Sequence, residues 1–451
     1  MNPSPTLHLH RRKLMSLSSQ INAPRLLTAV ALAALATASQ AANTSKTWCA
    51  DRCDQIVIDW NQQTHQVIKA ATGYQDPMAA SRILAMVHLA MHDAVNAAQP
   101  RYRTYAYQPK VSTSKSGADA AVAAAVAAHD VLASMFPKQQ EMLRATLDAT
   151  LHDAGMGASI AEGKKLGAEA AAAMIARRAD DGSQADEAYK PGKRPGEYQF
   201  VPGFDFVAAP HWRAVKPFTM RAPEQFRVAP PPALTSTAYV VDFNEVKATG
   251  SKAANARRSA DQTQYAAYWY EFSDSGWNRI ARTVARDKPQ DLWQRARTFA
   301  LLNAVMADAY IAGWDSKMHY NFWRPVTAIQ QADTDNNPAT TAAAHWEPML
   351  TTPPVQDHPS THSALGAAAA VALAHAFGGD RVAFTMASPS ALPEAPERSF
   401  KSFRAAAKEN ADSRVRAGLH FRFATTAGLQ LGEQIGHQAV RDMLAPVGGA
   451  Q

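Results

Sequence analysis

The chain has 451 residues, of which 46 are Lys or Arg and 39 are Asp or Glu. No basic run is interleaved with aromatic residues, so the small positive charge does not indicate a nucleic-acid partner. Alanine is abundant and long β-branched runs are scarce, which favours helices. The chain is long enough to bury one large core or two.

An export leader is predicted over 1–41. Basic residues at 11–13 and 25 precede an uncharged apolar run over 26–38, and the small-x-small triplet at 39–41 is a cleavage site. The apolar run is too short and alanine-rich for a membrane span, and no later stretch is typical of one. Cleavage would remove four of the 46 basic residues and leave 42 against 39 acidic ones. We expect an exported protein, periplasmic or secreted, with Sec and Tat export both open.

The cysteines are Cys49 and Cys53, close to the predicted cleavage site. In an oxidising compartment they could form a small local disulfide, and two free thiols are the alternative. A zinc site is not favoured, because the sequence has no further cysteine.

Apolar periodicity predicts an all-α fold of two bundles. In the first part of the chain, helices are expected at 55–70, 77–98, 117–136, 138–153 and 158–178. Later helices are expected at 236–249, 259–273, 287–312, 360–377, 397–410 and 413–444, with a loop at 333–358. Recurrent prolines over 186–235 break any regular element and predict an ordered crossover. The expected domains are therefore an N-terminal bundle over 42–185, this crossover, and a C-terminal catalytic bundle over 236–451.

A histidine pair stands in the second predicted helix. His88 and His92 are four residues apart, and Asp93 follows, so the two imidazoles share one helix face and could bind a divalent metal. Their neighbours are apolar and the spacing supplies no third ligand. Buried structural histidines are the favoured interpretation.

Three short segments in the last third of the chain combine cations, a hydroxyl group and two histidines. They run from Lys317 to Pro325, from Pro359 to His362 and from Ser413 to His420. Lys317, Arg324 and Arg414 supply three positive charges, enough to balance a phosphate or vanadate trianion. The histidines offer a nucleophile or metal ligand and a proton donor.

The first two segments each predict part of an anion site. Lys317 and Arg324 are seven residues apart, so on one helix they would share a face, with Pro325 placing Arg324 at its end. A solvated basic face is the alternative. Ser360 is a candidate N-cap, and the free N–H groups of Thr361 and of the following histidine could donate to an oxyanion. A plain helix cap is the alternative for this second segment.

The third segment is expected to open the last helix, with Ser413 as its cap. Arg414 and His420 are six residues apart, about 120° around an ideal helix. They converge on one ligand only if Arg414 lies in the first turn. A histidine here, taken alone, is more often a core residue.

Together the pattern Lys-x6-Arg-Pro, Pro-Ser-x-His and Ser-Arg-x5-His resembles a known superfamily. It contains the type 2 phosphatidic acid phosphatases (PAP2), bacterial acid phosphatases and vanadium-dependent haloperoxidases. The motifs are separated by 33 and 50 residues, and the resemblance covers about 300–430. It extends more loosely over 200–300, where 230–236 and 258–265 are similar to bacterial haloperoxidase relatives. A helical fold is implied.

The resemblance also implies residue roles. His420 would be bonded to vanadium or act as the phosphatase nucleophile, and His362 would be the acid and base. The equatorial oxygens would be held by Lys317, Arg324, Ser360, Thr361 and Arg414. Trp314 and Val355 would line the halide pocket. Thr361 stands where the family usually has glycine, so a left-handed backbone there would be strained. Val355 differs from the Phe or His of characterised chloro- and bromoperoxidases, which leaves the halide open.

The expected function is a haloperoxidase that oxidises halide with hydrogen peroxide at a histidine-bound vanadate cofactor. Alternatives are an exported acid phosphatase acting through phosphohistidine and a non-catalytic phosphate- or vanadate-binding protein. The long segment before Lys317 and the presence of Trp314 favour the haloperoxidase. Its partners would be small molecules: peroxide, halide and an organic acceptor, or a phosphomonoester for the phosphatase. The oligomeric state stays open, a homo-oligomer included.

Overall fold

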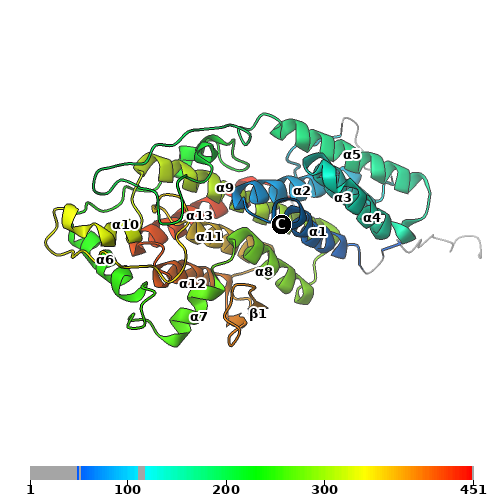
Figure 1. Cartoon of the computed structure of the whole chain (residues 1–451). Helices are drawn as coiled ribbons and strands as arrows, with labels where there is room; N and C mark the ends of the chain where they lie inside the picture. The colour runs from blue at the N-terminus through cyan, green and yellow to red at the C-terminus, as the bar shows by residue number, and fades with distance from the viewer. Residues whose placement is uncertain (1–47, 50–51, 110–116, 449–451) are drawn as a thin grey trace, which may run out of the picture. The chain divides into compact units, whose positions relative to one another are not determined.

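Helices form nearly all the regular structure in the computed structural model, which describes residues 48–49, 52–109 and 117–448 (Figure 1). The predicted leader over 1–41 lies outside the described residues. The all-α prediction is confirmed, with one small exception: strands β1 (Phe384–Ala387) and β2 (Glu397–Phe400) form an antiparallel pair with Phe384 opposite Phe400.

The helices follow one another along the chain with one long interruption. The first group is α1 (Gln55–Thr72), α2 (Pro77–Ala98), α3 (Ala120–Met135), α4 (Gln140–Thr150) and α5 (Ala158–Arg178). The second is α6 (Thr237–Thr249), α7 (Ala260–Tyr268), α8 (Ser273–Asp287), α9 (Leu292–Tyr320), α10 (Pro325–Gln330), α11 (Thr361–Ala376), α12 (Phe403–Arg416) and α13 (Arg422–Asp442). Short 3-10 segments lie at Pro137–Gln139, His152–Ala154, Pro210–Ala214, Pro223–Phe226 and Ala332–Thr334.

Local caps explain where several helices begin. The Asp76 carboxylate accepts the Ala79 N–H at 2.9 Å and Pro77 occupies the first turn, so α2 starts at the residue predicted. Asp291 and Gln294 form a capping box, which starts α9 five residues later than predicted. In Figure 1, α3, α4 and α5 gather at one end of the described fold, and α6, α7 and α10 at the other.

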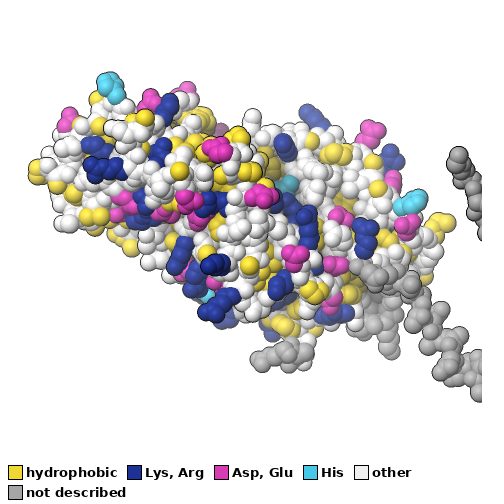
Figure 2. Space-filling model, turned by 90° about the horizontal axis from the view of Figure 1, so that it is seen from below, with side chains coloured by type: hydrophobic (Ala, Val, Ile, Leu, Met, Phe, Trp, Pro, Cys, Tyr) yellow, Lys and Arg dark blue, Asp and Glu magenta, His cyan; other side chains and the backbone are white. Residues whose placement is uncertain are grey.

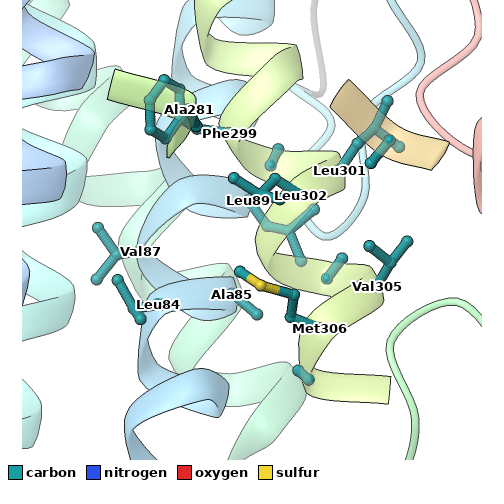
Figure 3. Packing of buried hydrophobic residues seen from close by; sticks show 14 of the residues in the cluster. Leu84, Ala85, Val87, Leu89, Ala281, Phe299, Leu301, Leu302, Val305 and Met306 are labelled. Carbon is teal, nitrogen blue, oxygen red and sulfur yellow. The ribbon is translucent and has the colours of Figure 1, made fainter. Parts of the chain in front are cut away.

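Helices α2 and α9 pack side by side in the core. Figure 3 shows Ala85 and Leu89 of α2 on the side of α9 that carries Leu302 and Met306, and all four side chains are fully buried. Helix α2 also packs on α3 and α5, while α9 packs on α11 and α13. Helix α9 takes part in both sets of contacts, so Lys317, buried near its C-terminal end, is held by a closely packed core.

The proline-rich segment over 186–235 contains no α-helix, as predicted. A buried carboxylate of α9 anchors it: Asp308 accepts the N–H groups of Phe218, Thr219 and Met220 at 2.7, 2.6 and 3.2 Å. The prolines keep this segment out of helices and strands, so its backbone N–H groups need other acceptors, and Asp308 supplies one. The segment is therefore an ordered crossover held on α9.

Two predicted helices in the middle of the chain were wrong in extent. The helix expected over 259–273 ends at Tyr268, and α8 then fills 273–287, where no helix was predicted. Helix α8 begins without a side-chain cap, and most of its residues are polar or charged. Its buried face, with Trp277, Ile280 and Val284, was therefore hard to recognise against that polar background.

The helices predicted at 397–410 and 413–444 were also wrong at their ends. Residues 397–400 are strand β2, and α12 starts after Ser402, whose side chain accepts the Ala405 N–H. Helix α12 then runs on to Arg416 and stops because Gly418 has a φ of 79°. A side chain at Gly418 would lie 2.4 Å from the Gly250 carbonyl oxygen, so this break is also a close backbone approach.

A stripe of glycines brings α13 against α11. Gly428, Gly432 and Gly436 recur every four residues, so they lie on one face of α13. A Cβ atom at Gly432 would lie 2.0 Å from the Ala364 carbonyl oxygen, and one at Gly428 would lie 2.2 Å from that of Ser360. The two helices are therefore in backbone contact, and Gly428 reaches the N-cap of α11.

The remaining predictions concern the surface and the cysteines. Among the described residues, no helix is both long and apolar enough to cross a membrane. Figure 2 shows basic and acidic side chains intermixed on the face it draws, in keeping with the nearly balanced charge. Of the two states left open for the cysteines, the structure has the disulfide between Cys49 and Cys53.

A buried acid in α8 makes stability depend on pH. Asp274 is fully buried, and burial raises its pKa from 3.8 to about 7, although it accepts a 2.5 Å hydrogen bond from Tyr74. The unfolded chain ionises this group at lower pH than the folded one, so stability falls as pH rises from about 4 to about 7. Asp274→Asn should therefore stabilise the protein above pH 7, by at most about 4 kcal/mol, and change little at pH 4.

The measurement is urea unfolding of wild type and Asp274→Asn between pH 4 and pH 8. Asp59→Asn, on the exposed side of α1, is the matched control and should track the wild type. A constant difference between Asp274→Asn and wild type across this range would contradict the prediction.

Candidate functional site

The N-terminus of α11 forms the floor of the candidate site. Ser360 is the N-cap, as predicted, and its fully buried hydroxyl lies 3.1 Å from the Ser363 hydroxyl. Thr361 opens the helix and is not among the residues with positive φ, so the strain considered for this position does not arise. Gly313 of α9 makes room for it, since a Cβ there would lie 2.4 Å from Thr361 Cγ2. The free N–H groups of this first turn are suited to an anion.

Two buried cations hold the loop before this helix. Lys317 Nζ donates to the carbonyl oxygens of Gln356 and Asp357 at 2.5 and 3.1 Å. Arg324 donates through Nε to the Val355 carbonyl at 2.6 Å and through a terminal nitrogen to the Leu419 carbonyl at 2.8 Å. Both cations thus reach the site, with part of their donor capacity already used by the backbone.

The expected placement of these two cations on one helix is wrong. Helix α9 ends at Tyr320, because Asn321 adopts a left-handed conformation with φ 48°. Arg324 is instead the N-cap of the short helix α10, which begins at Pro325. Lys317 and Arg324 converge because the chain turns between them, and no shared helix face is involved.

The third motif is divided by the break at Gly418. Arg414 lies in the last turn of α12, and His420 lies in the connection before α13, so Ser413 does not cap the last helix. The break lets the two side chains approach the site from different directions, which removes the 120° separation expected on a single helix. A terminal nitrogen of Arg324 lies 2.9 Å from His420 Nε2 and 3.3 Å from its Nδ1.

Arg414 is the cation with spare donors. Its side chain is 2% exposed, and no described residue accepts a hydrogen bond from its guanidinium, whose Nε is fully buried. Burial and the charge of Arg324 lower the pKa of Arg414 to about 9. Burial and the same neighbour lower the pKa of Lys317 well below its usual value. An oxyanion would relieve both effects, because it supplies acceptors and negative charge in a buried cationic site.

The two histidines are neutral at physiological pH. Burial, and then the surrounding cations, lower the pKa of both His362 and His420 well below 6.5. His362 Nε2 lies 3.1 Å from the Glu271 carbonyl oxygen, so this nitrogen must donate and Nδ1 carries the lone pair. His362 can therefore accept a proton through Nδ1.

Asp357 was missed in the sequence. It is fully buried, and its Oδ1 lies 2.9 Å from His420 Nδ1 and 3.9 Å from a terminal nitrogen of Arg324. Burial raises the pKa of Asp357 to about 7, against the opposing charges of Arg324 and Lys317. The sequence signal that could have identified it is the position of this acid, three residues before Ser360 in the loop that precedes α11.

The two residues predicted to line a halide pocket, Trp314 and Val355, are both buried. Trp314 is buried, donates to the Ala208 carbonyl at 3.0 Å and packs edge-on to Tyr310. Val355 is buried and offers its carbonyl to Arg324. Their role in a halide pocket stays a prediction.

The histidine pair of α2 is buried, and each imidazole has a polar neighbour. His88 and His92 are fully buried, with His88 Nε2 2.8 Å from Asn61 Nδ2 and His92 Nδ1 3.2 Å from Asp93. Asp93 itself accepts the N–H groups of Tyr105 and of the two residues after it. The described residues contain no group of three or more His, Cys, Asp or Glu side chains arranged for a metal ion.

Comparison with known proteins agrees with this geometry. Residues 297–449 match the family described as the VCPO second helical-bundle domain. A vanadium chloroperoxidase of Curvularia inaequalis is 25% identical over 492 residues, covering 83% of this chain and 78% of that protein.

Two crystal structures extend the likeness to the fold. A bacterial vanadium-dependent iodoperoxidase matches with a TM-score of 0.75 at 26% identity, covering 88% of this chain and 98% of that one. A holo-type bacterial vanadium-dependent chloroperoxidase, 19% identical with a TM-score of 0.66 over 83% of this chain and 93% of its own, shares the fold. Residues 297–449 therefore match the VCPO second helical-bundle domain, in a chain that resembles the vanadium-dependent haloperoxidases over most of its length.

Proposed function

We propose that this protein is a vanadium-dependent haloperoxidase that oxidises halide with hydrogen peroxide. The observation that carries the proposal is Arg414, a buried guanidinium without an acceptor among the described residues, beside two further buried cations and a helix N-terminus. Such a site favours a tetrahedral oxyanion with multiple negative charges, because each oxygen finds a donor. The likeness to haloperoxidases supports vanadate as that anion.

The residues present fit vanadate. Lys317, Arg324 and Arg414 would offset its charge, and the Ser360 hydroxyl with the Thr361 N–H would bind the remaining oxygens. His420 would bond the central atom through Nε2. Bound vanadate would supply a Lewis-acidic centre that activates peroxide without changing oxidation state.

His362 is the proposed proton carrier. Its Nε2–H is held by the Glu271 carbonyl, and its low pKa keeps Nδ1 free to take a proton from peroxide as it enters. The cations that lower this pKa also make the protonated imidazole a strong acid, so the proton can be returned to a leaving oxygen.

A phosphatase is the second candidate, favoured by the same neutral imidazole of His420. A buried, uncharged imidazole with its Nε2 lone pair beside three cations could attack a phosphomonoester, with His362 protonating the leaving group. The third alternative, simple anion capture, needs the cations but neither histidine.

One paired assay tests the proposal. Purified protein with orthovanadate, bromide or iodide, and peroxide should halogenate a phenol, while vanadate-free protein should leave a phosphomonoester intact. His420→Ala should lower halogenation by at least about a thousandfold, because both the bond to vanadium and its orientation are lost. Phosphatase turnover that vanadate inhibits, without halogenation, would overturn the proposal in favour of the second candidate. Tight vanadate binding with neither activity would leave a binding protein.

We also propose export, supported by the leader pattern over 1–41 and by the Cys49–Cys53 disulfide, since such bonds persist mainly outside the cytoplasm.

A further inference from the structure

The buried Asp357 carboxylate lies at the site but lacks, among the described residues, the hydrogen bonds that a buried carboxylate usually accepts from the backbone. Asp308, by comparison, accepts three backbone N–H groups and the Thr219 hydroxyl. Neither oxygen of Asp357 receives an aligned hydrogen bond from a described residue. Its polar neighbours are the His420 imidazole, the Arg324 guanidinium and the Phe421 N–H.

The proton on His420 can be assigned from its two neighbours. Arg324 can only donate, and its terminal nitrogen is closer to Nε2, at 2.9 Å, than to Nδ1, at 3.3 Å. We take the closer nitrogen, Nε2, as the acceptor, which places the single proton of a neutral imidazole on Nδ1. That nitrogen lies 2.9 Å from the Oδ1 atom of Asp357, within reach of a hydrogen bond that the ring orientation in this structure does not align.

We propose that Asp357 is a positioning residue that holds His420 in its Nδ1–H form and thereby keeps the Nε2 lone pair directed at the bound anion. This inference rests on the proposed function only where it takes His420 Nε2 as the atom that bonds the anion's centre. A carboxylate behind a ligating histidine fixes the ring's tautomer and orientation and raises its basicity, and its loss costs typically 10- to 100-fold in affinity.

The same contacts bear on how an anion would reach His420. Arg324 lies against the Nε2 side of the ring, while Asp357 is within reach of both the imidazole and that guanidinium. An anion bonded to Nε2 must displace Arg324 from it. Alignment of the Nδ1–H with Asp357 would then orient the ring in place of the lost contact.

Two variants separate this role from simpler ones. Asp357→Asn keeps an oxygen that can accept the Nδ1–H, whereas Asp357→Leu has a similar size and no acceptor. Asp308→Asn is the matched control, since it weakens a buried carboxylate that does not touch His420. Histidine-labelled, vanadate-free protein is measured by nitrogen-15 NMR, with His420 assigned by its loss in His420→Gln, and orthovanadate affinity is measured by calorimetry.

We expect the Nδ1–H form in wild type, Asp357→Asn and Asp308→Asn, and a shift to the Nε2–H form in Asp357→Leu. Vanadate affinity should fall 10- to 100-fold in Asp357→Leu and by less than about threefold in Asp357→Asn. Both readouts are independent of halogenation, so a failure of the proposed enzymatic activity would leave them interpretable.

Two outcomes would overturn the inference. If the tautomer and the vanadate affinity of Asp357→Leu both match the wild type, Asp357 does not position His420. If Asp357→Asn and Asp357→Leu both bind vanadate more tightly than the wild type, the carboxylate repels the anion and does not position His420.

Discussion

Arg414→Met is expected to raise the stability of the vanadate-free protein while removing most of its affinity for vanadate. Burying an ion without a partner costs several kcal/mol, and Arg414 has no acceptor among the described residues, so its replacement by an apolar side chain of similar length should stabilise by about 1 to 3 kcal/mol. With anion present, two charge-assisted hydrogen bonds are lost, roughly 3 to 6 kcal/mol, or at least about a hundredfold in affinity.

The measurements are urea unfolding without anion and calorimetric titration with orthovanadate. The matched control is Arg416→Met, two residues further along α12, because Arg416 already pairs with Asp412 and Glu245. It should bind vanadate like the wild type. A vanadate-free Arg414→Met protein that is less stable than the wild type would show that Arg414 serves the fold.

Gly432→Ala is expected to destabilise the protein by about 2 to 4 kcal/mol, despite the higher helix propensity of alanine. Propensity alone would add about 1 kcal/mol of stability. The new Cβ, however, would lie 2.0 Å from the Ala364 carbonyl oxygen and 2.8 Å from the Ala368 nitrogen, both in the backbone of α11. Backbone cannot rotate away, so α13 must separate from α11 and lose its packing along that face.

Urea unfolding checks this result, with Gly157→Ala as the control. Gly157 precedes α5 in an extended conformation with open space around it, so the change there should stay below about 1 kcal/mol. Equal stability of Gly432→Ala and wild type would mean that α11 and α13 can separate at little cost.

Much of the fold could be predicted because its determinants are local. Apolar periodicity and the Asp76–Pro77 start define α2, and the recurrent prolines define the crossover over 186–235. The polar helix α8 was missed because much of its buried face is itself polar, Ser273, Asp274 and Asn278 included. The break at Gly418 depends on the approach of Gly250, which lies far away in the sequence and leaves no local pattern.

In the candidate site, too, local sequence features could be predicted and features that depend on tertiary contacts could not. The motifs identified Lys317, Arg324, Ser360 and Arg414 by residue type and order, and the structure brings them to one place. Their geometry was less predictable: Arg324 and His420 sit on turns between helices, where the path of the chain is set by tertiary contacts. Asp357 was unpredictable for a further reason, since its relation to His420 exists only after α11 and the α12–α13 connection have packed together.

The glycine stripe of α13 has a consequence for how the protein tolerates change. Where helices meet through side chains, a substitution can be absorbed by repacking, and the spacing between them drifts with the residues chosen. Here the Gly428 face lies directly on the Ser360 carbonyl, so the distance between α11 and the chain after His420 is set by main-chain atoms. Mutations elsewhere in the core can therefore accumulate with little effect on the spacing of these two helices. At the three glycines themselves, the same geometry leaves no room for a side chain of any size.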